Sequence, residues 1–198
     1  MAKRAFDLFC SAIGLLALAP VFAVVSVLIV RDSPGPVFFR QVRVGRQGGL
    51  FRIHKFRTMR HDLVGKGLSI TVGRDPRVTR IGAFLRRYKI DELPQLIDVL
   101  QGTMSLVGPR PEVPEYVAHY SDDDRKIVLS VRPGITDHAS LEFSDESLLL
   151  AGAADPQRLY IEEILPKKLH LYRAYAQMRT MTGDIGIILK TLRKIVRR

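Results

Sequence analysis

The sequence predicts an α+β protein with an amino-terminal re-entrant membrane helix, a small antiparallel β element and several amphipathic helices at a membrane interface. Three observations predict this fold. An almost uncharged apolar segment runs from Leu8 to Val30, apolar residues alternate on either side of a glycine-rich stretch, and apolar residues recur at helical spacing further along. With 198 residues, 46% of them hydrophobic, the chain has the length of one domain and can form a core.

Residues 1–32 are expected to form a re-entrant membrane helix-hairpin that bends at Pro20. The apolar segment is long enough to cross a bilayer core of about 30 Å. Basic residues flank both of its ends, Lys3 and Arg4 before it and Arg31 after it, which favours a cytoplasmic location for both ends. A proline inside a helix removes a hydrogen bond and forces a bend. The alternatives are a straight transmembrane helix and a cleaved signal peptide, which the apolar residues beyond Pro20 disfavour.

Residues 33–198 are expected to form a cytoplasmic catalytic domain. Alternating residues predict strands at 37–39 and 51–57, and the glycines between them suit a hairpin turn. Lys55 shares a strand face with two apolar residues, so it points either inward to a buried anion or, at the strand end, outward to water. A loop is expected at 65–76.

Three later segments have the spacing of amphipathic helices: 81–88, 93–100 and 185–196. The first and the last are rich in lysine and arginine, so they could rest on an anionic membrane. The alternative for the last segment is a core-packed helix with a solvated face. Gly102 suits the end of the middle helix, and the acidic run 122–124 predicts a helix start or a loop.

The net charge of +11 predicts an anionic partner, which leaves nucleic acid, anionic lipid and phosphorylated small molecules. The sequence has none of the usual nucleic-acid-binding motifs, so no nucleic-acid partner is expected. Cys10 is the only cysteine, which excludes an intramolecular disulfide and a cysteine-rich metal site. The five histidines show no metal-ligand spacing.

The strongest chemical signal is the carboxylate pair Asp91 and Glu92, which precedes the helix predicted at 93–100. One carboxylate of such a pair can attack phosphorus while the other holds a divalent metal, provided that nearby cations absorb the substrate's charge. The alternative is that both acids only complement the helix dipole. The candidate phosphate-binding cations are Lys55, Arg57, Arg86 and Arg110.

Arg110 lies between two prolines in the run Gly108-Pro109-Arg110-Pro111. The prolines limit backbone freedom, and the planar guanidinium offers a fork that matches a diphosphate. The alternative is an ordinary arginine in a surface loop.

Several ordered motifs together resemble the monotopic phosphoglycosyl transferases, the bacterial sugar transferase family. The resemblance covers nearly the whole chain, beginning with the apolar segment and its mid-helix proline. The other motifs are Gly35-Pro36-Val37-Phe38-Phe39-Arg40-Gln41 followed by Arg43 and Gly45, Lys55-Phe56-Arg57-Thr58-Met59, Asp91-Glu92-Leu93-Pro94-Gln95-Leu96, and Ser105-Leu106-Val107-Gly108-Pro109-Arg110-Pro111.

The resemblance implies transfer of a sugar 1-phosphate from a UDP-sugar to polyprenol (undecaprenyl) phosphate with release of UMP, the first membrane step of bacterial glycoconjugate assembly. It implies a ping-pong mechanism in which Asp91 forms a covalent phosphosugar intermediate. Mg²⁺ is the implied cofactor, held by Glu92 with Asp91. The implied location is the cytoplasmic face of the bacterial inner membrane in a monotopic topology, with anionic lipid as a further partner. The oligomeric state and the UDP-sugar stay open.

Some positions depart from the family pattern. Residues 137–143 replace the usual glycine and glutamine continuation, so sugar specificity is not carried over. Tyr172 precedes Tyr175 where many members have an acidic residue, so that acidic role is not carried over either. Asp184 matches a later family aspartate and is expected only to cap the last helix. Ala19 stands where a serine is frequent.

Three other functions compete with this interpretation. An ordinary glycosyltransferase would release UDP instead of UMP from the same donor. A nucleic-acid-binding protein would explain the positive charge, and a noncatalytic membrane adaptor would explain the apolar segment. The adaptor would have no use for the pair Asp91 and Glu92.

Overall fold

The computed structural model describes residues 2–63, 70–73 and 75–197. The helices are α1 (Ala2–Asp32), α2 (Arg80–Arg87), α3 (Gln95–Gln101), α4 (Pro114–Val117), α5 (Asp122–Val128), α6 (His138–Glu142), α7 (Glu146–Ala151), α8 (Pro156–Leu159), α9 (Leu165–Met178) and α10 (Met181–Val196). The strands are β1 (Phe38–Val44), β2 (Leu50–Phe56), β3 (Ser105–Val107) and β4 (Gly134–Thr136). Short 3₁₀ turns lie at Arg46–Gly48, His61–Leu63 and Ile90–Glu92, and a π-helical turn, Tyr160–Ile164, joins α8 to α9.

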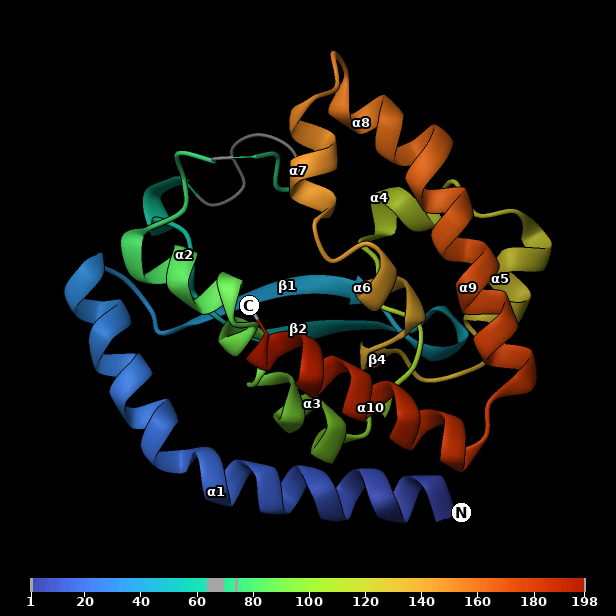
Figure 1. Ribbon diagram of the computed structural model, residues 1–198, viewed down its shortest axis with the longest axis horizontal. Coiled ribbons are helices and arrows are strands. Elements are labelled where there is room, and N and C mark those ends of the chain that lie inside the picture. The colour runs from blue at the N-terminus through green and yellow to red at the C-terminus, as the bar shows by residue number, and fades with distance from the viewer. Residues whose placement is uncertain (1, 64–69, 74, 198) are drawn as a thin grey trace.

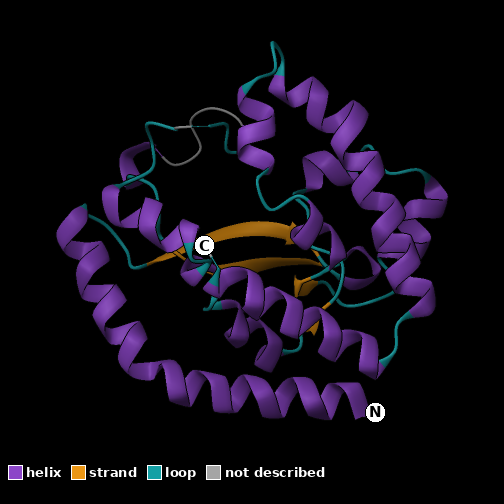
Figure 2. Ribbon diagram, viewed as in Figure 1, coloured by secondary structure: helices purple, strands orange, loops and turns teal. Residues whose placement is uncertain are grey.

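Helices surround a small central set of strands, and α1 lies along the outside of this assembly (Figures 1 and 2). This arrangement confirms the predicted mixture of helices and a small β element with a long apolar amino-terminal helix. Half of the loop predicted at 65–76, namely residues 65–69 and 74, lies outside the described residues.

The helix α1 is continuous from Ala2 to Asp32 and contains Pro20 without an interruption of helical structure. Figure 1 shows that it bends along its length, as a proline inside a helix promotes. Within the described part of the chain, α1 is the one helix long and apolar enough to cross a membrane, and only 11% of its most apolar window is buried. Side chains such as Phe9, Leu16 and Val24 are exposed and form a long apolar surface along α1.

The amino-terminal end of α1 is bonded to the centre of the domain. The Lys3 ammonium donates to Asp184 Oδ2 at 2.5 Å and to the main-chain oxygen of Val107 at 3.2 Å. The buried carboxylate of Asp7 accepts a hydrogen bond from the Ser105 hydroxyl at 2.8 Å. These bonds hold the start of α1 against β3 and α10.

The carboxyl-terminal end of α1 is bonded to the same domain through Arg57 and Asp32. The Arg57 guanidinium donates to the main-chain oxygens of Ser33 and Pro34 at 2.7 and 2.5 Å. Asp32 Oδ2 accepts from the main-chain N–H of Ile81, at the start of α2, at 2.9 Å. A buried apolar cluster joins this end of α1 to β2 and α2: Val25, Ile29, Phe56 and Leu85.

The strands β1 and β2 form the predicted antiparallel hairpin, in which Phe39 lies opposite Lys55 and Gln41 opposite Ile53. The prediction of a helix near 93–100 is confirmed by α3. Gly102 follows it with φ of +87°, a left-handed conformation that glycine adopts without a steric cost. The prediction of a short basic helix is confirmed by α2.

A second sheet, which the sequence analysis did not predict, pairs β3 with β4 in parallel. Its two strands have three residues each. Gly108 and Gly134 allow the chains to approach closely, because a Cβ at Gly134 would lie 2.0 Å from the Gly108 nitrogen. The loop that follows β3 carries Arg110, so this sheet positions that arginine.

The largest core cluster joins α4, α5, α7 and α9, and it includes the buried rings of Tyr116, Tyr160 and Tyr172. The helix α5 begins at Asp122, which confirms the helix start predicted from the acidic run. The amphipathic helix predicted at the carboxyl end is α10. Thr180 caps it by accepting from the Gly183 N–H. Asp184 instead accepts hydrogen bonds from Lys3 and from the Tyr175 hydroxyl, so the expectation that it only caps this helix is wrong.

Candidate active site

A cavity of about 760 Å³ lies between the β1–β2 hairpin, α2, the turn Ile90–Glu92 and the helices α4, α6, α7 and α9. Its volume falls within the range of about 300–1,000 Å³ that small-molecule sites occupy. Lys55, Arg86, Asp91, Glu92 and Arg110 all line it. Residues far apart in the sequence therefore meet at one site, as the resemblance implies.

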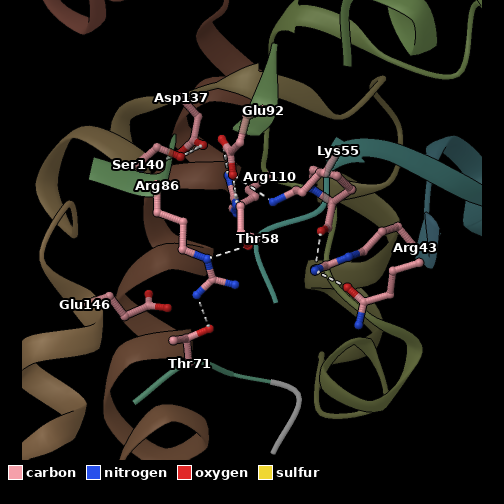
Figure 3. A network of polar contacts seen from close by, with 12 residues as sticks. Arg43, Lys55, Thr58, Thr71, Arg86, Glu92, Arg110, Asp137, Ser140 and Glu146 are labelled. Atoms are coloured by element: carbon pink, nitrogen blue, oxygen red, sulfur yellow. Dashed lines mark hydrogen bonds and ion pairs between the residues drawn. The ribbon is translucent and has the colours of Figure 1, made fainter. Parts of the chain in front are cut away.

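The Glu92 carboxylate is held by two cations (Figure 3). Lys55 Nζ donates to Oε1 at 2.8 Å, and Arg110 Nη2 donates to the same oxygen at 2.5 Å. Arg110 Nη1 donates to Oε2 at 3.2 Å. Burial alone would raise the pKa of Glu92, but the charges of Arg110 and Lys55 hold that pKa well below its usual range. Glu92 is therefore ionised.

Asp91 is equally buried but differently surrounded. No hydrogen-bond partner for its Oδ1 atom occurs among the residues that the structure describes. Burial, and then the charge of Glu92, raise the pKa of Asp91 above its usual value. A carboxylate that lines a cavity without a protein partner is free to react with a group that enters the cavity.

The turn Ile90–Glu92, which carries both carboxylates, lies between α2 and α3. Lys89, just before it, adopts a left-handed conformation with φ of 57° and ψ of 20°. A non-glycine residue in this region costs about 1 kcal/mol or more, so the surrounding contacts must hold it there. The prediction that Asp91 and Glu92 lie at the amino-terminal boundary of a helix is confirmed, since α3 begins shortly after them.

The four predicted cations occupy three kinds of position. Lys55 and Arg110 both contact Glu92, and burial lowers the pKa of Lys55 to about 8. The Arg86 Nε donates to the Thr58 hydroxyl at 2.8 Å, and its charge acts on Asp91. The Arg57 guanidinium instead bonds the main-chain oxygens that follow α1. Arg57 also lines the cavity, so its bonds hold the end of α1 beside the site.

A second polar group on the cavity wall was not among the predicted site residues. Tyr160 donates its hydroxyl to Glu112 Oε1 at 2.9 Å, and the Lys168 ammonium lies 3.2 Å from that hydroxyl. Lys168 also forms an ion pair with Glu146. Glu112 directly follows the Gly-Pro-Arg-Pro run, and this position beside a predicted site residue could have indicated it. Lys168 lies on a helix with no distinguishing pattern.

The two carboxylates fit the usual way in which proteins hold Mg²⁺, through one or two carboxylates and the phosphates of a substrate. A carboxylate has about four acceptor positions. The three bonds to Glu92 use both positions on Oε1 and one on Oε2, so Oε2 keeps one. Asp91 Oδ1 is unbonded within the described ranges. In the same ranges, no group of three or more His, Cys, Asp or Glu side chains forms a self-sufficient metal site.

The chain is similar to several bacterial proteins of known name. It is 56% identical over 109 residues to the "Exopolysaccharide production protein PSS" of Rhizobium leguminosarum bv. phaseoli, which covers 54% of each chain. It is 39% identical over 198 residues to the "Undecaprenyl-phosphate glucose phosphotransferase" of Komagataeibacter xylinus, covering 97% of this chain and 35% of that protein.

A third similar protein is the "UDP-glucose:undecaprenyl-phosphate glucose-1-phosphate transferase" of Caulobacter vibrioides, 34% identical over 201 residues that cover 96% of this chain and 68% of that protein. The chain therefore spans about half of the Rhizobium protein and about a third of the Komagataeibacter protein. The family model "Bacterial sugar transferase" matches residues 1–198. On this match over its whole length, the chain belongs to the bacterial sugar transferase family.

Proposed function

We propose that this chain transfers a sugar 1-phosphate from a UDP-sugar to polyprenol phosphate and releases UMP, as the first membrane step of bacterial glycoconjugate assembly. The observation that carries the proposal is the unequal carboxylate pair in the cavity. Glu92 is bonded by Lys55 and Arg110, whereas Asp91 has an oxygen without a partner in the described structure. The names of the relatives support the donor and acceptor, since they include UDP-glucose and undecaprenyl phosphate.

The proposed reaction has two displacements. A carboxylate oxygen of Asp91 attacks the phosphorus that carries the sugar, and the bond from this phosphorus to the bridging oxygen of UMP breaks. UMP leaves, and the phosphosugar stays on Asp91 as an acyl phosphate. A phosphate oxygen of the polyprenol phosphate then attacks the same phosphorus and displaces the Asp91 carboxylate, which forms the lipid diphosphate sugar.

The cations of the site have two tasks in this scheme. Lys55 and Arg110 keep Glu92 ionised and oriented, and together with Arg86 they offset the charge of the donor's diphosphate. Glu92, with Asp91, would hold Mg²⁺, which when bound neutralises diphosphate charge and favours departure of UMP.

We also propose a monotopic location on the cytoplasmic face of the bacterial inner membrane. In this proposal residues 1–32 enter and leave the membrane on one face, with the bend at Pro20, and residues 33–198 form the cytoplasmic catalytic domain. The bonds from both ends of α1 to one domain support this topology. Exposed apolar side chains on α10, such as Leu189 and Leu192, and its basic residues suit contact with anionic lipid.

The decisive experiment traps the intermediate. The detergent-solubilised protein is incubated with Mg²⁺ and either UDP-glucose or UDP-N-acetylgalactosamine, without acceptor, and its peptides are analysed by mass spectrometry. We expect a phosphosugar adduct on the peptide that contains Asp91, together with one equivalent of UMP. Asp91→Asn should give neither product. Turnover without an adduct, or release of UDP instead of UMP, would overturn the proposal.

A further inference from the structure

Two groups of polar side chains line the cavity. In the first group, Lys55, Arg86 and Arg110 accompany Asp91 and Glu92. The second group has four polar side chains, Glu112, Glu146, Tyr160 and Lys168, which we call the distal cluster. The proposed reaction uses the first group and assigns no task to the second.

The distal cluster is internally paired and deeply placed. Glu112, Tyr160 and Lys168 are each at most 5% exposed. The Tyr160 hydroxyl donates to Glu112, and Lys168 bonds both the Tyr160 hydroxyl and Glu146. Arg43 lies 3.9 Å from Glu112 and adds a second cation. Two carboxylates and two cations therefore balance, so the distal cluster together with Arg43 has no excess positive charge to attract a phosphate.

Next to the distal cluster, two tyrosine hydroxyls lack partners. The hydroxyls of Tyr116 and Tyr172 are buried and make no hydrogen bond within the described part of the chain, although both residues line the cavity. A buried hydroxyl without a partner is costly, and it indicates a bound group or a water that completes it. Tyr172 and Arg110 line the same cavity, so this hydroxyl is available to a ligand that also contacts the arginine.

A neutral, hydroxyl-rich ligand fits these features. Paired carboxylates, a lysine and tyrosine hydroxyls can accept from and donate to several hydroxyl groups at once, whereas the absence of excess positive charge disfavours an anion. In the proposed reaction the sugar is bonded directly to the phosphorus that Asp91 attacks. The sugar must therefore lie beside Lys55, Arg86 and Arg110.

We propose that the distal cluster, with the Tyr172 hydroxyl, forms the subsite that binds the sugar of the nucleotide donor. This inference rests on the proposed function, because it takes the donor to be a nucleotide diphosphate sugar. The ribose of the same donor has similar chemistry, so the test must separate the sugar from the nucleoside.

The test measures binding without turnover. In an Asp91→Asn background, which cannot form the intermediate, isothermal titration calorimetry compares the Kd of UDP-glucose and UDP-N-acetylgalactosamine with that of UDP, all with Mg²⁺. We expect at least one UDP-sugar to bind more tightly than UDP. Adding Tyr172→Phe should weaken that UDP-sugar about 3- to 10-fold, as for one lost hydrogen bond, and leave the Kd of UDP unchanged. Adding Glu146→Gln should likewise weaken binding of the UDP-sugar and leave the Kd of UDP unchanged.

Tyr175→Phe is the matched control. The Tyr175 hydroxyl lies 2.9 Å from the Val107 oxygen and 2.8 Å from Asp184 Oδ1, away from the cavity lining. Its loss should lower the melting temperature and leave both binding constants unchanged. Tyr172→Phe removes a hydroxyl with no partner in the described structure, so it should not lower the melting temperature.

Three results would overturn the inference. The first is equal affinity of UDP and both UDP-sugars for the Asp91→Asn protein. The second is an unchanged Kd for the UDP-sugar in both variants. The third is equal weakening of UDP and UDP-sugar, which would assign the cluster to the nucleoside. An Asp91 adduct in the trapping experiment combined with any of these results would refute only the sugar subsite and leave the proposed reaction intact.

Discussion

Asp91 and Glu92 are neighbours in the chain, yet their surroundings shift their pKa values in opposite directions. Two buried carboxylates side by side cannot both ionise without a large cost unless cations offset it. Here Lys55 and Arg110 both bond Glu92. The pKa of Glu92 is therefore low and that of Asp91 is high. The charge on Asp91 is the costly one, which suits the nucleophile of the proposed reaction.

This difference predicts opposite effects on stability for two similar substitutions. Glu92→Gln leaves Lys55 and Arg110 buried without their anion and should lower the free energy of unfolding by about 3–5 kcal/mol. Asp91→Asn removes a buried, unpartnered charge and should leave that free energy unchanged or slightly higher. Thermal denaturation in detergent measures both effects, and UMP release should be lost in Asp91→Asn. A loss of stability in Asp91→Asn as large as in Glu92→Gln would contradict the expected difference between the two carboxylates.

Lys55 predicts how activity depends on pH. Burial lowers the pKa of Lys55 to about 8, so the ammonium that bonds Glu92 is present below this pH and is lost above it. In the proposed reaction Asp91 must be ionised to attack, and its raised pKa shifts the acidic limb of the pH profile upward. We expect kcat/KM for UMP release to rise from acidic pH and to fall through about pH 8.

Lys55→Arg provides the check on this assignment. Arginine stays protonated throughout this range, so the alkaline limb should move to higher pH even if the overall rate falls. An alkaline limb that stays near pH 8 in Lys55→Arg would assign it to another group.

Strand alternation left two directions open for Lys55, and it could not place Arg57. Alternation places Lys55 and Arg57 on the same face only while the strand continues, and β2 ends at Phe56. Beyond that point the chain turns and Arg57 reaches the end of α1. The ion pair of Glu112 with Lys168 could not be predicted from the sequence either, because it joins distant segments through the tertiary fold.

At the scale of elements, a helix or strand could be predicted wherever its own residues show a periodic pattern or a stop residue. The β1–β2 hairpin, α3 with Gly102 and α10 were predicted from alternation, helical spacing and a glycine stop. The parallel pair β3–β4 was missed. Strands of three residues have too little alternation to detect, and their pairing depends on contacts between distant parts of the chain.

The β3–β4 pair predicts a matched set of glycine substitutions. A Cβ at Gly134 would lie 2.0 Å from the Gly108 nitrogen, in the loop that leads to Arg110. Gly134→Ala should therefore lower the free energy of unfolding by about 1–3 kcal/mol, as overpacking does, and should reduce UMP release by displacing Arg110.

Gly186, inside α10, serves as the control for this prediction. A Cβ there meets no atom within 4 Å, and alanine favours a helix more than glycine does. Gly186→Ala should raise the free energy of unfolding by about 0.5–1 kcal/mol and leave activity unchanged. Chemical denaturation and UMP release measure both variants. Equal stability of Gly134→Ala and the parent would mean that the close approach is not required.

At the scale of the whole molecule, the two anchors of α1 restrict its path through a membrane. A straight helix of 31 residues would be about 46 Å long, more than the roughly 30 Å of a bilayer core. Such a helix would carry its two ends to opposite faces. Lys3 bonds Asp184, and Asp32 bonds the start of α2, both in one domain. A bent helix with both ends on one face satisfies these bonds.

Cysteine labelling tests this path directly. In a Cys10→Ser background, which has no other cysteine, single cysteines replace Ala2, Leu16 or Arg31, all of them exposed in the structure. A membrane-impermeant maleimide is added to inside-out and right-side-out vesicles. Positions 2 and 31 should both react only in inside-out vesicles, where the cytoplasmic face is outward. Position 16, on the exposed apolar surface of α1, should react only after detergent is added.

The pattern of the three positions distinguishes the topologies. A helix that spans the membrane would place positions 2 and 31 on opposite faces, so one would react in each kind of vesicle, and the re-entrant topology would be eliminated. Reaction at position 16 without detergent would place the apolar surface in water. Lys3→Ala adds a further check, since it removes the bond to Asp184. If that bond holds the amino-terminal half of α1 against the domain, Lys3→Ala should lower the melting temperature while the labelled face of position 31 stays the same.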